Sequence, residues 1–141
     1  MYPLFSALSF LAIAHCLGDE PALVSEQSWP RHIIDNSSRG ADGVKLGDLN
    51  NDGLPDVVTG WEEGFNTRIY LHPGKGKVTQ KWPSAIIGRT PSAEDAVFVD
   101  LNGDHYLDVV VSCEGKDQAI YLIFAPKNGE VLDSSQWTQI L

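Results

Sequence analysis

A nine-residue polar loop occurs twice in this 141-residue chain and constrains its fold more than any other feature. The first copy runs from Asp48 to Asp56, and the second, 52 residues later, from Asp100 to Asp108. Each copy has carboxylate or amide side chains at positions 1, 3, 5 and 9. Carboxylates at this spacing repel one another unless a cation lies between them. One such segment is often only a solvated turn, but two copies in matching context indicate two metal sites.

The donor set favours calcium. Alternate residues of the loop can turn inward around one hard cation, with the backbone carbonyl of position 7 as a further ligand. Calcium accepts many oxygens in flexible geometry, whereas magnesium requires a rigid octahedron. An EF-hand is not expected, because position 12 is Thr59 in one copy and Val111 in the other instead of a bidentate Glu. Position 6 requires a positive φ, which costs more at His105 than at Gly53, so we expect the second site to be weaker.

The repetition extends beyond the two loops. Each unit contains four strand-like runs. Three of them correspond between the units: 43–47 with 95–99, 56–61 with 108–113, and 68–71 with 119–122, the last after the loss of one residue in the turn. The fourth run follows a tryptophan, at Trp29, Trp82 and Trp137. A unit of about fifty residues with four short strands indicates a β-propeller blade. The sequence therefore predicts an all-β fold with two complete blades of four antiparallel strands plus the start of a third, which together form a partial propeller.

Both units resemble the FG-GAP/VCBS repeat family of calcium-binding β-propellers, which includes integrin-α-like repeats. The resemblance covers about residues 29–141, and the D-x-N-x-D segments within 48–56 and 100–108 carry it. It implies a propeller of several blades, so we expect the chain to continue into further blades of a longer protein. It also implies one calcium ion in each loop, the first held by Asp48, Asn50, Asp52, the carbonyl of Leu54 and Asp56, and the second by Asp100, Asn102, Asp104, the carbonyl of Tyr106 and Asp108.

The first residues of the chain predict export. Residues 1–18 contain no Asp, Glu, Lys or Arg, and their apolar run is too short to span a membrane but suits a signal peptide. Cys16 leaves a lipoprotein open as a less favoured alternative, because the residue before it is not the small one that a lipobox requires. We expect a signal peptide at 1–18, a short linker at 19–28 and the repeat region at 29–141, in a secreted or periplasmic/extracellular protein.

The remaining features favour binding over catalysis. The net charge of −9 argues against nucleic acid or an anionic membrane as a partner. The sequence contains no nucleophile elbow, H-E-x-x-H, C-x-x-C or P-loop motif. Cys113 is expected to be a small buried hydrophobe, and the tryptophans to pack between blades instead of lining a sugar site.

We therefore expect a secreted calcium-binding module that binds a protein or carbohydrate ligand, with no intrinsic catalysis. The alternative that stays open is the N-terminal propeller fragment of an exported enzyme, a hydrolase, lyase or oxidoreductase, whose active site lies outside this chain.

Overall fold

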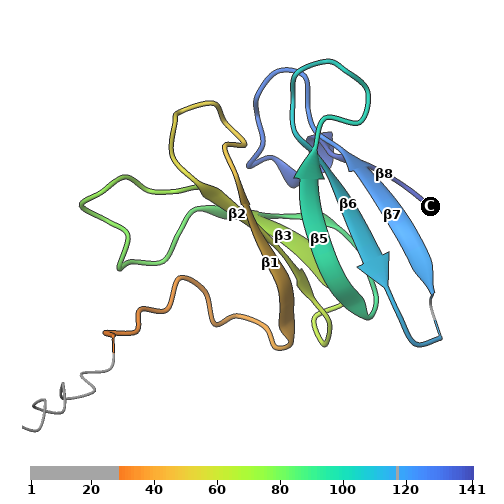
Figure 1. Ribbon diagram of the computed structural model, residues 1–141, viewed down its shortest axis with the longest axis horizontal. Helices are drawn as coiled ribbons and strands as arrows, with labels where there is room; N and C mark the ends of the chain where they lie inside the picture. Colours follow the sequence, from red (N-terminus) through yellow and green to blue (C-terminus); the bar gives the residue numbers. More distant parts are fainter. Residues whose placement is uncertain (1–28, 117) are drawn as a thin grey trace, which may run out of the picture. The chain divides into compact units, whose positions relative to one another are not determined.

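Eight strands form two four-stranded antiparallel sheets in this computed structural model, which describes residues 29–116 and 118–141 (Figure 1). The predicted all-β fold with two blades of four antiparallel strands is confirmed. The predicted signal peptide and linker, residues 1–28, lie outside the described residues. Sheet 1 has the order β1 (Ala41–Gly47), β2 (Asp56–Trp61), β3 (Asn66–Tyr70), β4 (Ser84–Gly88), and sheet 2 the order β5 (Ala93–Val99), β6 (Asp108–Cys113), β7 (Ala119–Phe124), β8 (Thr138–Ile140).

The fourth strand of each sheet corrects one part of the prediction. Strand β8 pairs with β7 through Phe124 and Thr138, so the run after Trp137 completes sheet 2 and does not start a third blade. Strand β4, which follows Trp82, completes sheet 1 in the same way, and residues 29–34 form no strand. The physical reason is that a strand joined by a connection of modest length returns antiparallel beside the strand before it.

The strand register also corrects the alignment of the two units. Val57 pairs with Tyr70 and Val109 pairs with Ile123, so β3 and β7 correspond at a spacing of 53 residues. The second hairpin therefore gains one residue relative to the first, although the sequence comparison predicted a loss. Thr67 and Ile69 consequently correspond to Ile120 and Leu122, whereas the sequence comparison aligned Ile69 with Ile120. The two alignments differ by two residues, so each side chain stays on the same face of its sheet.

The core lies between the two sheets. Val58 and Ile69 of sheet 1 and Val109 and Ile123 of sheet 2 are all 0% exposed in one hydrophobic cluster. Glycine permits a close approach at several points, and at one of them a Cβ added to Gly60 would lie only 2.6 Å from the Cβ of Ala93. The two sheets are thus packed face to face with little space for larger side chains at this crossing.

The other two sheet faces differ from each other. Residues 31–40, which we call the strap, run over the second face of sheet 1, where Trp61 and Tyr70 are buried. The second face of sheet 2 leaves Val97, Ile120 and Ile140 between 43% and 55% exposed. In the described part of the chain, the single helical segment is a 3₁₀ turn at Ser134–Gln136, and no helix is long and apolar enough to cross a membrane.

Candidate calcium-binding loops

The loop between β1 and β2 is folded by its own polar side chains. The two carboxylate oxygens of Asp48 accept hydrogen bonds from the backbone N–H groups of Asp52 and Gly53, each at 2.9 Å. Asn50 Oδ1 accepts from the N–H of Asp52 at 3.1 Å, and Asp52 Oδ1 accepts from the N–H of Leu54 at 2.8 Å. The oxygens at positions 1, 3 and 5 therefore turn into the loop, as the spacing predicts.

The loop between β5 and β6 repeats this pattern. Asp100 accepts from the N–H groups of Gly103, Asp104 and His105 at 2.7, 3.2 and 3.0 Å. Asn102 Oδ1 accepts from the N–H of Asp104 at 2.9 Å, and Asp104 Oδ1 from that of Tyr106 at 3.1 Å. Burial raises the pKa of Asp100, but the hydrogen bonds from the loop outweigh it and lower the pKa overall. The loop thus stabilises a negative charge at position 1.

The aspartates at position 9 are fully buried and have a role that the motif alone does not show. Asp56 accepts from the N–H of Leu49 and from the N–H of His72, both at 2.8 Å. The Asp56 carboxylate therefore ties the start of the first loop to the chain just after β3. Burial raises the pKa of Asp56, against the lowering effect of its hydrogen bonds.

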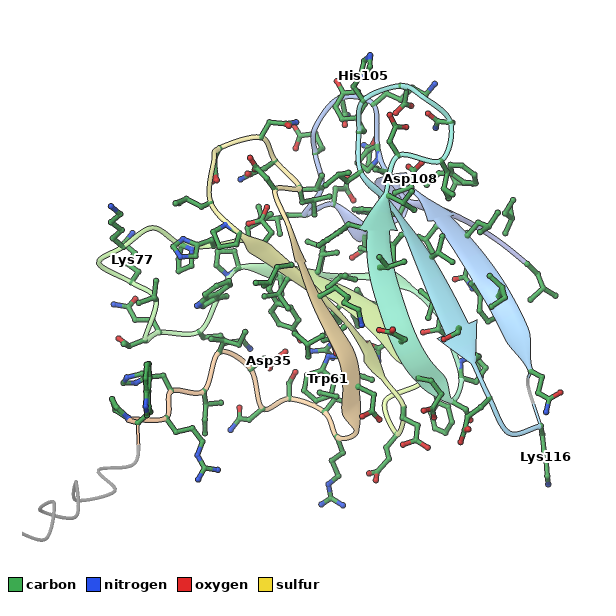
Figure 2. All side chains as sticks on the ribbon, viewed as in Figure 1. Asp35, Trp61, Lys77, His105, Asp108 and Lys116 are labelled. Carbon is green, nitrogen blue, oxygen red and sulfur yellow. The ribbon has the colours of Figure 1, made fainter. Side chains whose placement is uncertain are left out.

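Asp108, which Figure 2 labels at the base of the second loop, makes the equivalent bonds to the N–H of Leu101 at 3.1 Å and of Ala125 at 2.8 Å. It is also 0% exposed. Asp108 therefore ties the second loop to the residue after β7, as Asp56 ties the first loop to the chain after β3.

The backbone of the two loops corrects the reasoning about their relative strength. Position 6 has a positive φ in both copies, +81° at Gly53 and +70° at His105, as predicted. Position 4 does so as well, with +58° at Asn51 and +75° at Gly103. Each loop therefore contains one glycine and one other residue in the left-handed region. The strain at His105 has a counterpart at Asn51, so it gives no reason to rank the second site below the first.

One atom of the second loop meets a direct test of fit for a cation. Asp104 Oδ2 is buried and makes no hydrogen bond, and it forms an ion pair with the largely exposed Lys127 ammonium at 3.5 Å. A buried carboxylate oxygen without a hydrogen-bond partner is costly, and a bound cation would remove that cost. In the first loop the equivalent Asp52 Oδ2 accepts from the amide of Asn50 at 3.0 Å. The oxygens of both loops fit a hard cation such as calcium.

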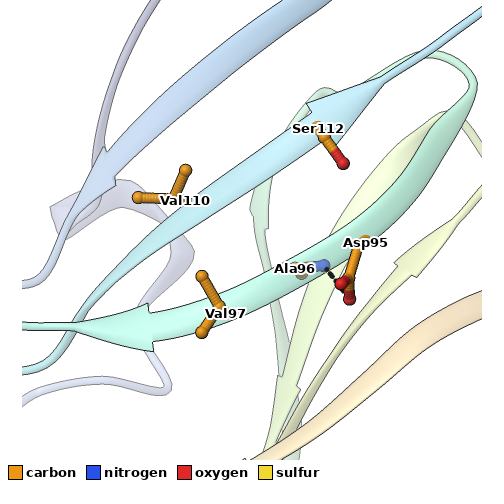
Figure 3. A pocket seen from close by; sticks show the side chains of 5 residues that line it. All are labelled: Asp95, Ala96, Val97, Val110 and Ser112. Carbon is orange, nitrogen blue, oxygen red and sulfur yellow. Dashed lines mark hydrogen bonds between the residues drawn. The ribbon is translucent and has the colours of Figure 1, made fainter.

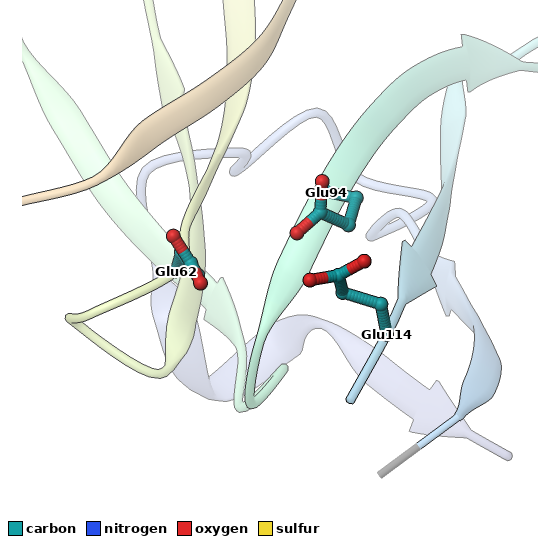
Figure 4. Close-up of side chains that lie close together, drawn as sticks. All are labelled: Glu62, Glu94 and Glu114. Atoms are coloured by element: carbon teal, nitrogen blue, oxygen red, sulfur yellow. The ribbon is translucent and has the colours of Figure 1, made fainter. Parts of the chain in front are cut away.

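A separate acidic cluster lies among the described residues at the hairpin end of the sheets, where Glu62, Glu94 and Glu114 bring ligand atoms within 4.8 Å of one another (Figure 4). The loops lie at the opposite end (Figure 1). Burial raises the pKa of Glu94, and repulsion from Glu114 and Glu62 adds to the effect. Sequence reasoning missed this cluster, although Glu62 and Glu114 occupy equivalent places after β2 and β6. It creates a local negative potential.

The tryptophans only partly follow the prediction. Trp137 is 8% exposed in the main core and donates to the carbonyl of Val131 at 2.9 Å. Trp61 packs with Tyr70 and Trp82 on the strap side of sheet 1, so packing between the sheets is wrong for this residue. The face that holds Trp61 is turned away from sheet 2, which the spacing of tryptophans alone does not reveal. Cys113 is buried at 8% exposure, as expected.

The fold and the two loops define the class: a β-repeat protein with blade-like antiparallel sheets, each carrying an Asx-rich loop between its first two strands. Residues 48–111 match the family model described as an FG-GAP-like repeat. The match begins at the first residue of the first loop and ends within β6, so this segment is an FG-GAP-like repeat region and the resemblance is confirmed there. The sheets in the described residues do not close a ring. No solved structure matches the chain.

Proposed function

We propose that this chain is a secreted binding module whose two loops each hold a calcium ion, and that it has no catalytic activity of its own. The observation that carries the calcium assignment is the matching pair of loops, with Asp104 Oδ2 buried and without a hydrogen bond. The first ion would be held by Asp48, Asn50, Asp52, Asp56 and the carbonyl of Leu54, and the second by Asp100, Asn102, Asp104, Asp108 and the carbonyl of Tyr106.

The position of the loops supports a structural role for the ions. Each loop joins two neighbouring strands, and its last aspartate is tied to the chain beyond the next strand. A cation in the loop would neutralise carboxylates that the fold already gathers between strands. Calcium would then stabilise the folded sheets by mass action, by about 2.7 kcal/mol at a hundredfold excess over its dissociation constant.

The ligand of the module is a protein or a carbohydrate in this proposal, and export follows from the apolar run within residues 1–18. A net charge of −9, with the acidic cluster of Glu62, Glu94 and Glu114 at one end, disfavours acidic partners.

Calcium titration of the parent and of two single variants tests the proposal. Isothermal titration of the parent should show two sites, and Asp52→Ala and Asp104→Ala should each remove one of them. Asp133→Ala is the matched control, because Asp133 accepts hydrogen bonds from Ser135 in a turn outside both loops. Calcium heats that are unchanged in both loop variants would refute the assignment. An equal response to magnesium would refute the choice of metal.

A further inference from the structure

The strap, residues 31–40, covers the face of sheet 1 that corresponds to the inner face of sheet 2. That inner face of sheet 2 is covered by sheet 1. Val109 and Ile123 of sheet 2 are 0% exposed in the cluster that both sheets form. Val57 and Tyr70 are their equivalents in sheet 1, at the same strand positions, but they lie on the strap side in a separate cluster. The strap therefore lies where the repeat pattern places a neighbouring sheet.

A buried polar network attaches the strap to sheet 1. Two backbone hydrogen bonds add to it, from the N–H of Trp82 to the carbonyl of Ile34 at 3.2 Å and from the N–H of Glu62 to the carbonyl of Gly40 at 2.7 Å. The carboxylate of Asp35 is 1% exposed and accepts hydrogen bonds from Arg68 Nη1 at 2.8 Å and from the Tyr70 hydroxyl at 3.0 Å. Trp61 Nε1 donates to the same hydroxyl at 2.9 Å (Figure 2 labels Asp35 and Trp61). A buried ion pair contributes less than its short distances suggest, because both charges lose their hydration when they pair, although removing one partner alone is destabilising. The network therefore fixes where the strap binds, and water can replace its hydrogen bonds when the strap leaves the sheet.

The strap covers this face incompletely. A pocket of about 190 Å³ remains between the strap and sheet 1, with Ile34 and Asp35 on one side and Val57 and Trp61 on the other. On the same face of β1, Val44 and Leu46 stay 57% and 66% exposed. The apolar surface of this face is thus larger than the segment that covers it.

The outer face of sheet 2 has the opposite character. Ile120 and Ile140 occupy the positions that Thr67 and Ala85 hold in sheet 1. Thr67 and Ala85 are 0% and 6% exposed against sheet 2, whereas Ile120 and Ile140 are 55% and 46% exposed. The exposed side chains are larger and more apolar than the covered ones they correspond to. A solvent-facing sheet surface normally shows the reverse.

Val97 and Val110 extend this outer face around a shallow pocket of about 140 Å³ that Ser112 also lines (Figure 3). Asp95, at the edge of the same surface, is already paired with Lys45 at 2.6 Å. The face therefore presents apolar groups without an unpaired charge at this edge.

We propose that the strap is a displaceable plug, and that the face it covers takes the outer face of sheet 2 of a second copy of this chain. The packing of sheet 1 on sheet 2 within one copy supplies the geometry, because the two exposed faces correspond by register to the two packed ones. The contact is head to tail, so repeated association gives rings or filaments. Arg68 keeps two partners when Asp35 leaves, the side chain of Asn66 at 3.1 Å and the ring of Trp61.

The test releases the strap and measures association of the full chain in calcium-containing buffer. Asp35→Lys places a cation beside Arg68 and should expel the strap, and Asp35→Asn should do so more weakly. Hydrogen exchange at the Trp82 amide, which donates to the carbonyl of Ile34 in the strap at 3.2 Å, reports the release. We expect sedimentation velocity to show that Asp35→Lys associates at roughly one tenth of the concentration that the parent requires or less.

A second substitution identifies the contacting surface. Ile120→Glu in the Asp35→Lys background should restore the monomer, because it puts a charge on the outer face of sheet 2. Ile33→Glu is its matched control, since Ile33 is 62% exposed on the strap and belongs to neither face. Circular dichroism checks that each variant is folded.

The proposal is wrong if the released variants stay monomeric, or if Ile120→Glu leaves the association unchanged. It is also wrong if no substitution at Asp35 speeds exchange at the Trp82 amide, since the strap is then a fixed part of sheet 1.

Discussion

Removing the buried carboxylate of Asp56 should destabilise the fold even when no calcium is present. Asp56 is 0% exposed and accepts hydrogen bonds from the N–H groups of Leu49 and His72, both at 2.8 Å. Asp56→Ala leaves the buried N–H of Leu49 and the part-buried N–H of His72 without an acceptor, and a fully buried group of this kind costs about 1–3 kcal/mol. Burial raises the pKa of Asp56, so the substitution also removes an unfavourable buried charge. We therefore expect a net loss of about 2–4 kcal/mol in the free energy of unfolding.

Urea unfolding in excess EDTA at neutral pH, followed by tryptophan fluorescence, measures this loss without any contribution from calcium. The midpoint should fall while the slope m stays constant, since the surface exposed on unfolding is unchanged. Asp56→Asn should lose less than Asp56→Ala, because the amide keeps one acceptor oxygen. Glu130→Ala, at an exposed loop position, is the control and should lie within about 0.5 kcal/mol of the parent. A loss below about 0.5 kcal/mol for Asp56→Ala in EDTA would show that the carboxylate acts only as a metal ligand.

Three further outcomes follow from the structure. Gly60→Ala should cost about 1–3 kcal/mol in urea unfolding, since its Cβ would lie 2.6 Å from that of Ala93; a neutral effect would contradict the close packing of the sheets. Burial raises the pKa of Asp35, but its hydrogen bonds lower that pKa overall to about 2. The ionised carboxylate therefore adds about 2 kcal/mol to the free energy of unfolding near neutral pH, and this contribution should be lost as pH falls from about 4 towards 2. Asp35→Asn should abolish this dependence of stability on pH. Lys127→Met should tighten calcium binding by the second loop about two- to fivefold by titration, because the ammonium lies 3.5 Å from Asp104 Oδ2 but is largely exposed; unchanged affinity would show that this ion pair does not compete with the metal.

Sequence reasoning succeeded where local chemistry decides the structure. The spacing of Asp48, Asn50 and Asp52 was enough to predict a loop that turns its oxygens inward, and the hydrogen bonds of that loop are local. The β-branched runs on both sides of the loop predicted the strands β2 and β6.

Sequence reasoning failed where contacts between distant segments of the chain decide the structure. The two Ile-Tyr-Leu triplets look equivalent, but the pairing of Val109 with Ile123 places the second two residues out of step. A triplet contains no information on how many residues the preceding hairpin spans. Likewise, nothing adjacent to Asp35 in the sequence indicates that Arg68 and Tyr70 will enclose it, because those partners lie more than thirty residues away.

The left-handed positions of the loops show a third limit. A glycine motif indicates Gly53 but not Asn51, since asparagine adopts a positive φ without a signature of its own. The strain is therefore shared between positions 4 and 6 in a way that only the backbone angles reveal.

The correspondence between the covered face of sheet 1 and the exposed face of sheet 2 has an evolutionary consequence. A tandem duplication of a stretch such as 93–140 would add a sheet whose inner face already complements the surface awaiting it. Growth of the array by whole units would then need no simultaneous invention of a new interface, and each added unit would present the same surface again to the next. Changes in length would be tolerated at the junctions between sheets, whereas a single-residue insertion at the start of β6, before Val109, would turn Val109 and Val111 away from the core.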